Sequence, residues 1–210
     1  RTKDRPIASN QISIRLSIFY IIILCFLALI VLLNFNSFTI FLALGSMPLA
    51  FTYPFMKRFT YWPQLFLGIT FNYGLILGWT AVKGQIDVVA IIFYLGAIFW
   101  TLGYDTIYGY QDIKDDEIIG LKSTSIKFKN NPKKFLILCY SFFLLNLLIT
   151  GFFIELNSFF YLIYILIMLQ MFYFQLKKLN IKNSLECLKV FKSNNLLGLL
   201  VLISLAGGKI

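Results

Sequence analysis

Long runs of apolar residues separated by short polar breaks dominate this chain. Most of the runs approach the roughly 20 helical residues needed to cross a hydrocarbon core of about 30 Å. They are unbroken rather than alternating, which favours membrane-spanning helices over the strands of a barrel. The pattern predicts an all-α, polytopic transmembrane helical bundle with about seven spans, of which the second and the last are short. The runs cover approximately residues 12–33, 38–55, 64–82, 88–103, 134–153, 158–174 and 196–206.

The composition supports a membrane protein. Of the 210 residues, 59% are hydrophobic and the mean hydropathy is +0.80, whereas a soluble domain has roughly 45–50% apolar residues. The chain carries 19 Lys and Arg against 9 Asp and Glu, a formal charge of +10. In a soluble protein this charge would suggest nucleic acid as a partner, but here the cations lie between apolar runs. We therefore expect a lipid bilayer and no nucleic acid as partner.

The basic residues also predict how the chain crosses the membrane. If successive loops alternate sides, 17 of the 19 basic residues lie on one side and only Lys83 and Lys209 on the other. Lys and Arg accumulate in cytoplasmic loops, so the loops at 56–63 and 104–134 should be cytoplasmic. We expect a multi-pass protein of a bacterial inner (plasma) membrane, with the mitochondrial inner membrane as the less favoured alternative.

Histidine, cysteine and glycine residues bear on packing more than on chemistry. Histidine is absent, which excludes zinc and haem sites that depend on it. Cys25, Cys139 and Cys187 lie far apart in the sequence and suggest no disulfide framework. Gly74 and Gly78 form a GxxxG pair in one apolar run, a pattern typical of closely packed transmembrane helices.

The stretch of residues 104–128 interrupts the apolar pattern. It contains five of the nine acidic residues of the chain. On a helix, Asp105, Tyr108, Asp112 and Asp116 would share one face, because steps of three and four residues fall on neighbouring turns. The resulting stripe would be only about 40° wide.

Such a row of carboxylates repels itself unless a cation lies between its members. Carboxylate oxygens suit Mg²⁺, which typically takes one or two of them and completes its shell with water or substrate phosphate. A metal–phosphate site is therefore one interpretation. The other is a solvated acidic loop between two helices, and the spacing alone does not decide between them.

The sequence DTIYGYQDIKDD, followed by IGLKSTSIKF, closely resembles the second aspartate motif of the UbiA superfamily of membrane prenyltransferases. Within that superfamily it is most similar to the branch that acts on 4-hydroxybenzoate in ubiquinone synthesis. Three further segments agree, namely RTKDRPIAS at residues 1–9, TYPFMKRFTYWPQLFLG at 52–68 and FKSNNLLGLLVLISLAG at 191–207. The resemblance covers essentially residues 1–210, which implies a single transmembrane prenyltransferase domain.

One departure from the family pattern concerns the start of the chain. The family's first aspartate motif, NDxxDxxxD, should lie immediately before RTKDRP, and two helices should precede that point. About seven of the family's nine spans would then be present. On this basis we expect an N-terminally truncated copy with an incomplete Mg²⁺ site, which by itself would be inactive.

The resemblance implies a reaction. The family transfers a polyprenyl group from polyprenyl diphosphate to an aromatic acceptor, here the ring carbon ortho to the hydroxyl of 4-hydroxybenzoate. Mg²⁺ held by the aspartate motifs neutralises the leaving diphosphate, and the ring carbon attacks the allylic cation. No covalent enzyme intermediate is needed, in agreement with the lack of a Ser–His or Cys–His pair.

The same resemblance assigns roles to individual residues. Asp112 and Asp116 match the metal-binding pair that holds Mg²⁺–diphosphate, and Asp105 matches a further acidic position of the family. Lys57, together with Tyr53, matches the YxxxK element. The candidates for binding diphosphate or the rest of the substrates are Arg58, Lys122, Tyr53, Tyr108, Arg1 and Arg5, because Arg and Lys bind phosphate oxygens and Tyr can orient a carboxylate or face a cation.

Three alternatives to a 4-hydroxybenzoate prenyltransferase remain at this point. The chain could instead be a UbiA-type enzyme with another acceptor, an inactive truncated remnant, or a small polytopic cation-coupled transporter. A transporter would place its charges near the bilayer midplane, whereas the acidic stretch here flanks the predicted cytoplasmic edge. A simple membrane-orienting role also explains each loop cation and each interfacial tyrosine.

Overall fold

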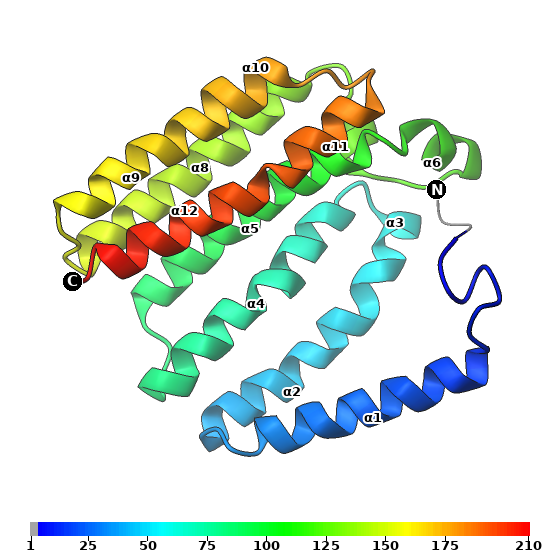
Figure 1. Ribbon diagram of the computed structural model, residues 1–210, viewed down its shortest axis with the longest axis horizontal. Helices are drawn as coiled ribbons and strands as arrows, with labels where there is room; N and C mark the ends of the chain where they lie inside the picture. Colours follow the sequence, from blue (N-terminus) through cyan, green and yellow to red (C-terminus); the bar gives the residue numbers. More distant parts are fainter. Residues whose placement is uncertain (1–3) are drawn as a thin grey trace.

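The structure is a computed structural model that describes residues 4–210, and within these residues it contains helices and no strands. Figure 1 shows the helices running side by side, with their connections at the two ends of the bundle. Segment η2 is a π-helical turn that continues α9. The elements are α1 (Ile14–Leu32), α2 (Ser37–Thr52), η1 (Tyr53–Phe55), α3 (Met56–Phe59), α4 (Pro63–Lys83), α5 (Val88–Gly109), α6 (Ile113–Ile119), α7 (Thr124–Lys127), α8 (Pro132–Phe153), α9 (Ser158–Leu169), η2 (Gln170–Gln175), α10 (Leu176–Lys178), α11 (Ser184–Lys192) and α12 (Asn194–Gly207).

Seven helical segments of the described chain are long and apolar enough to cross a membrane. The predicted fold class, an all-α bundle of about seven spans, is therefore confirmed. The segments are Ile14–Leu32, Ser37–Phe59, Pro63–Lys83, Val88–Gly109, Pro132–Phe153, Ser158–Lys178 and Ser184–Gly207.

Two predicted boundaries were wrong, because basic residues that we assigned to loops are helical. The second span continues through η1 and α3 as far as Phe59, so Lys57 and Arg58 belong to its last turn. The last span begins at Ser184, and Lys189 and Lys192 lie in α11. Long cationic side chains can keep their charge in the headgroup region while their helix continues into the membrane. Charge therefore did not mark the end of either helix.

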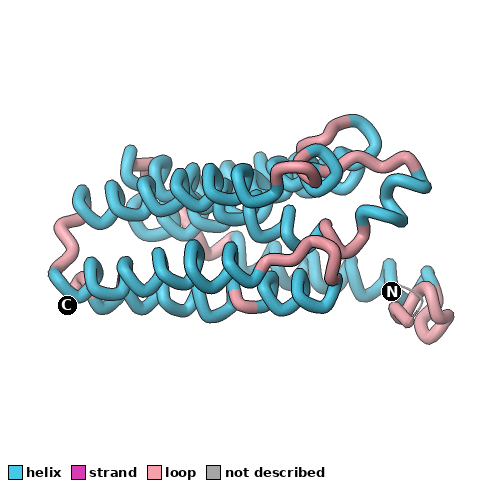
Figure 2. The backbone as a smooth tube through the Cα atoms, turned by 90° about the horizontal axis from the view of Figure 1, so that it is seen from above, coloured by secondary structure: helices cyan, strands magenta, loops and turns pink. Residues whose placement is uncertain are grey.

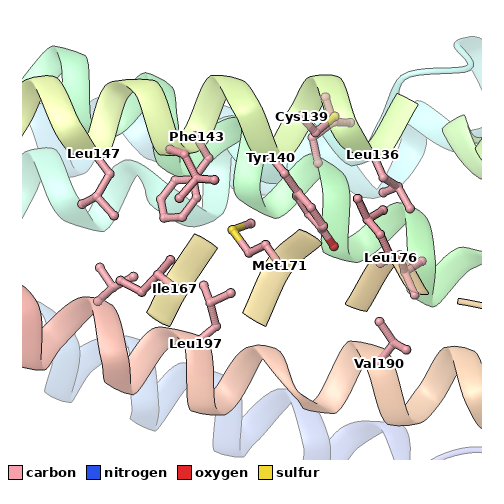
Figure 3. Close-up of a cluster of buried hydrophobic side chains, with 14 of the residues drawn as sticks. Leu136, Cys139, Tyr140, Phe143, Leu147, Ile167, Met171, Leu176, Val190 and Leu197 are labelled. Atoms are coloured by element: carbon pink, nitrogen blue, oxygen red, sulfur yellow. The ribbon is translucent and has the colours of Figure 1, made fainter. Parts of the chain in front are cut away.

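The core lies in the C-terminal half of the chain, where α5 and α8 pack closely. Figure 3 shows Tyr140 and Phe143 of α8 facing Met171 and Leu197 from other helices, and all four side chains are fully buried. A Cβ atom on Gly103 of α5 would lie 2.8 Å from the Tyr140 ring. Glycine at this position therefore allows the close approach of α5 and α8.

The N-terminal helices face the surroundings instead. No residue of α1 is buried, as expected of a helix that faces lipid, and in Figure 1 α1 lies at the edge of the bundle beside α2. A Cβ atom on Gly74 or Gly78 of α4 would have no neighbour within 4 Å. The close packing predicted from the GxxxG pair is therefore wrong for the described chain, since no helix approaches α4 on that face.

The bundle has two different ends. Figure 2 shows the loops gathered at both ends of the roughly parallel helices. In Figure 1 the end with α3, α6 and the α10–α11 connection carries the acidic stretch, and the other end carries the α8–α9 turn and the C-terminus. At that other end Asn157 N–H donates to the Gly208 carbonyl at 2.9 Å. All the predicted site residues in the described chain from Tyr53 to Lys122 belong to the first end.

Candidate active site

An ion pair joins two of the predicted site residues across the bundle end. Lys57 Nζ lies 3.1 Å from Asp116 Oδ2. Lys57 comes from the last turn of α3 and Asp116 from the first turn of α6. Asp116 is only 7% exposed, so its carboxylate is held inside the protein rather than solvated. The interpretation of this stretch as a solvated acidic loop fails for Asp116.

The backbone around this ion pair is also fixed. α6 ends at Gly120, whose φ of +78° lies in the left-handed region that glycine adopts readily. The chain then turns back, so that Leu121 N–H donates to the Asp116 carbonyl and Lys122 N–H donates to the Lys57 carbonyl, each at 2.8 Å. These bonds hold the segments that carry Lys57 and Asp116 together independently of their side chains.

A buried polar cluster anchors α7 to α5 beneath this segment. The hydroxyls of Thr106 and Thr124 lie 2.6 Å apart, and Ser125 Oγ donates to the Thr106 carbonyl at 2.7 Å. Gln64 Oε1 of α4 accepts the Thr124 N–H at 3.0 Å. All four residues are 3% exposed or less. Sequence reasoning gave them no role; the available signal was the run of hydroxyl residues in KSTSI.

Asp105 and Lys57 face a common cavity. It has a volume of about 220 Å³, and its lining includes Tyr53, Lys57, Gln64 and Asp105. The structure thus places the YxxxK pair, Tyr53 and Lys57, at one cavity with the first acidic residue of the stretch, Asp105.

The predicted single helical stripe was wrong. α5 ends at Gly109, and a turn leads to Asp112, the N-cap of α6, so Asp105 and Asp116 lie on different helices. Gly and Asp are poor residues for a helix interior, and Asp favours an N-terminal cap. The break at 110–112 separates α6 from α5, and Asp116 on α6 faces Lys57.

Tyr108 and Lys122 contact other protein groups in the structure, and their role in substrate binding stays a prediction. The Tyr108 ring packs on Phe191 of α11, with centroids 4.6 Å apart. Lys122 Nζ lies 3.4 Å from the Phe59 carbonyl and 5.7 Å from the centre of the Tyr61 ring. Both residues remain at the site end of the bundle, but Lys122 directs its charge toward the α3–α4 connection rather than toward Asp116.

Of the three arginine candidates, the two that the structure describes, Arg5 and Arg58, form no ion pair with Asp116. Arg58 follows Lys57 in α3 and is exposed. Arg5 is exposed, and its carbonyl accepts hydrogen bonds from the Ser9 N–H and hydroxyl at 2.8 and 2.9 Å. Arg1 lies outside the described residues, so its predicted role stays a prediction.

Comparison with known proteins gives this arrangement a context. The model of the UbiA prenyltransferase family matches residues 1–199. The chain belongs to the UbiA prenyltransferase family. This match favours the prenyltransferase hypothesis over the transporter hypothesis, because it covers the helices that carry Lys57, Asp105 and Asp116 together.

Individual relatives agree with the family match. A 4-hydroxybenzoate octaprenyltransferase of Francisella tularensis subsp. novicida (strain U112) is 42% identical over 205 residues, covering 97% of this chain and 71% of the relative. A mitochondrial 4-hydroxybenzoate polyprenyltransferase of Rattus norvegicus is 50% identical over 137 residues, covering 65% of this chain and 37% of the relative. The apo structure of a UbiA homolog from Aeropyrum pernix K1 shares the fold, with a TM-score of 0.76 at 17% identity over 100% of this chain and 78% of that one.

The acidic residues of this UbiA-family chain fit an Mg²⁺ ion whose coordination is shared between protein and substrate, rather than an ion enclosed by protein ligands alone. No group of three or more Asp, Glu, Cys or His side chains could hold a metal within the part of the chain that the structure describes. Mg²⁺ commonly takes one or two carboxylates and fills its shell with substrate phosphate and water. A carboxylate has about four acceptor positions, so the bond of Asp116 to Lys57 leaves it able to accept more.

Proposed function

We propose that this protein transfers a polyprenyl group from a polyprenyl diphosphate to the ring carbon ortho to the hydroxyl of 4-hydroxybenzoate, in ubiquinone biosynthesis. The relatives named for 4-hydroxybenzoate support this acceptor, at 42% identity over 97% of the chain for the Francisella protein. The structural observation that carries the proposal is the Lys57–Asp116 pair beside the cavity that Asp105 lines. It combines a fixed cation with carboxylates at the mouth of an apolar bundle.

Asp112 and Asp116 are the residues that would hold Mg²⁺ with the diphosphate. The bound ion supplies charge neutralisation of the leaving group. Asp112 caps α6 and Asp116 lies in its first turn, so one short helix carries both carboxylates. Lys57, which binds Asp116 in the structure, is positioned to donate to a diphosphate oxygen as a point charge.

The polarity of the bundle fits an apolar prenyl chain and the charged groups of the two substrates at different places. A polyprenyl chain belongs among the apolar helices, whereas the diphosphate and the benzoate carboxylate belong at the charged end. That end carries α3, α6 and most of the basic residues, which favours a cytoplasmic position for it. We place the protein in a bacterial plasma membrane with these site segments on the cytoplasmic side.

Transferase activity can be tested directly in membranes that contain the full-length protein. Labelled polyprenyl diphosphate and Mg²⁺ are supplied with 4-hydroxybenzoate, with homogentisate or with a hydroxynaphthoate. The expected product is 3-polyprenyl-4-hydroxybenzoate alone, and chelation of Mg²⁺ should abolish it. Prenylation of another acceptor but not of 4-hydroxybenzoate would overturn the proposed acceptor, and transfer that persists in excess chelator would overturn the metal role.

A further inference from the structure

A chain of buried polar side chains crosses the bundle away from the acidic residues, and Gln175 is at its centre. Tyr140 of α8 donates its hydroxyl to Gln175 Oε1 at 2.5 Å. Gln175 Nε2 in turn donates to Ser193 Oγ and to Asn194 Oδ1, each at 3.2 Å. Tyr140 and Gln175 are both 0% exposed. Unpaired polar groups at such depth would be costly, so each bond constrains its neighbours.

The chain of bonds continues to Trp100 of α5. Asn194 Oδ1 accepts the Trp100 Nε1–H at 2.9 Å. Asn194 Nδ2 donates to the Val190 and Phe191 carbonyls at 3.3 and 3.0 Å. Because the amide nitrogen is used by those two carbonyls, the oxygen must face Trp100 and Gln175. One asparagine therefore links the position of the indole to the position of Gln175.

Packing holds the indole of Trp100 in the same orientation. It stacks on Phe143, with ring centres 5.1 Å apart and an interplanar angle of 26°. It meets Tyr104 edge-on at 6.0 Å and 81°. Gly198 lies opposite, where an added Cβ would be 3.5 Å from the indole. The ring has little freedom to turn.

Gln175 reaches this position through an unusual piece of backbone. It is the last residue of the π-helical turn Gln170–Gln175. A π turn is wider than an α turn, and such turns are rare and frequently occur at functional sites. The turn also contains Gln170, whose Nε2 is buried without a hydrogen-bond partner among the described residues. Of the two glutamines at the ends of this turn, Gln175 is hydrogen-bonded and linked through Asn194 to Trp100, whereas Gln170 Nε2 has no such bond.

Trp100 lines a cavity of about 280 Å³ between α4, α5, α11 and α12, together with Tyr104 and Phe191. This cavity lies deeper than the acidic residues, because Trp100 precedes Asp105 by five residues, or roughly 7.5 Å along α5. Phe191 also contacts Tyr108, whose ring is 4.6 Å away, so the aromatic lining continues up to the candidate site. The first carbons of a prenyl chain whose diphosphate is held near Asp105 would lie at this level.

Resting on the proposed function, we propose that Trp100, Tyr104 and Phe191 form the wall against which the allylic cation develops, and that Gln175 is a positioning residue for Trp100. When the bond between C1 and the diphosphate oxygen breaks, its electron pair leaves with diphosphate and positive charge spreads over C1 and C3. A ring carbon of the acceptor then bonds to C1, and its hydrogen leaves as a proton to water. Aromatic faces attract such a cation, and tryptophan does so most strongly.

The matched test is Gln175→Met against Gln170→Met, two identical substitutions at the ends of one turn. Each variant of the full-length protein is assayed in membranes for kcat and for both KM values, and its thermal unfolding midpoint is recorded. A cation contact exists only in the transition state, so Gln175→Met should lower kcat by about ten-fold with little change in either KM. Gln170→Met should leave kcat unchanged.

A double-mutant cycle separates positioning from a structural role. Trp100→Phe keeps a ring but removes the N–H that Asn194 accepts, so kcat should fall, and adding Gln175→Met to it should cost nothing further. Tyr140→Phe, which leaves the Gln175–Asn194 bond in place, should give a smaller loss than Gln175→Met. Independent, multiplying effects of the two substitutions would overturn the positioning role. A lower unfolding midpoint for Gln175→Met with unchanged kcat would overturn it as well.

These outcomes are distinct from failure of the proposed function. If the unsubstituted protein prenylates no aromatic acid, the proposed function fails. If it is active and Gln175→Met behaves like Gln170→Met, the inference about Trp100 fails while the function stands.

Discussion

The hydroxyl of Thr106 on α5 lies 2.6 Å from the hydroxyl of Thr124 on α7, and both residues are 0% exposed. This pair connects the helix that carries Asp105 to the segment that follows Asp116. The acidic residues are therefore placed by neutral hydroxyls as well as by the charge of Lys57. Replacing either hydroxyl by an apolar group would remove a hydrogen-bond partner from the other, which is costly in a buried position.

Thr124→Val should impair both stability and activity. Valine keeps the shape but leaves the Thr106 hydroxyl with only its bond to the Leu102 carbonyl, at a cost of about 1–3 kcal/mol. Displacement of the segment that holds Asp116 should also lower the transferase rate, measured with the thermal unfolding midpoint in the same membranes.

Thr39→Val provides the control for that prediction. Thr39 and Thr80 form a second buried hydroxyl pair, at 3.0 Å between α2 and α4, with no contact to the site. Loss of the Thr39–Thr80 hydrogen bond should lower the unfolding midpoint to a similar extent and leave the transferase rate unchanged. If both variants lose the same activity, the rate reports general stability and Thr124 has no special influence on the site.

Lys57→Met should reduce kcat/KM for the diphosphate substrate by about 100-fold, because one positioned cation on a developing phosphate charge is worth several kcal/mol. The variant should also lose some stability, because the Lys57 side chain is 39% exposed but its removal leaves the buried Asp116 carboxylate without its partner. The measurement is steady-state kinetics with varied polyprenyl diphosphate.

Lys129→Met is the control, because Lys129 pairs with Glu117 at 2.6 Å on the exposed side of α6. Equal losses in the two variants would show that only the total charge matters.

Asp116→Asn should abolish transfer, whereas Asp115→Asn should be tolerated. The two residues are neighbours in α6, but Asp116 is buried against Lys57 and Asp115 is exposed. Asparagine keeps the size and removes the negative charge that would bind Mg²⁺, so the loss should exceed about 100-fold. Activity is assayed over a range of Mg²⁺ concentrations. Full turnover of Asp116→Asn at ordinary Mg²⁺ would rule out its metal role.

The apolar runs were sufficient to predict the spans, because backbone polar groups in lipid need hydrogen-bond partners within the protein, and a helix supplies them within one segment. They were insufficient for the ends of the second and last spans. Basic residues such as Lys57 and Lys189 suggested that a helix had ended, but both residues are part of their helical segments.

The candidate site was predictable only in part. The motif pattern identified Lys57 and Asp116, which the structure brings to 3.1 Å although they are 59 residues apart. Neither the break after Gly109 nor the role of Gln64 follows from the sequence. The local preferences of Gly109 and Asp112 permit a break but do not require one, since both residue types also occur inside helices. The role of Gln64 depends on contacts between helices, and a buried glutamine in an apolar run looks the same whether it supports a site or only packs.

Gly109→Ala should destabilise the site end of the bundle. A Cβ atom at Gly109 would collide with Ser125 Oγ and lie 3.3 Å from Gln64 Nε2, and overpacking of a well-packed position typically costs about 1–3 kcal/mol. Because Ser125 and Gln64 both hold α7, the rate should fall together with the unfolding midpoint.

Gly74→Ala is the matched control, since Gly74 is also helical and an added Cβ there would have no neighbour within 4 Å. Alanine is the better helix former by roughly 1 kcal/mol, so Gly74→Ala should raise the unfolding midpoint or leave it unchanged, with full activity. If Gly109→Ala were as stable and active as Gly74→Ala, the close contact between α5 and α7 would not be what positions Asp116.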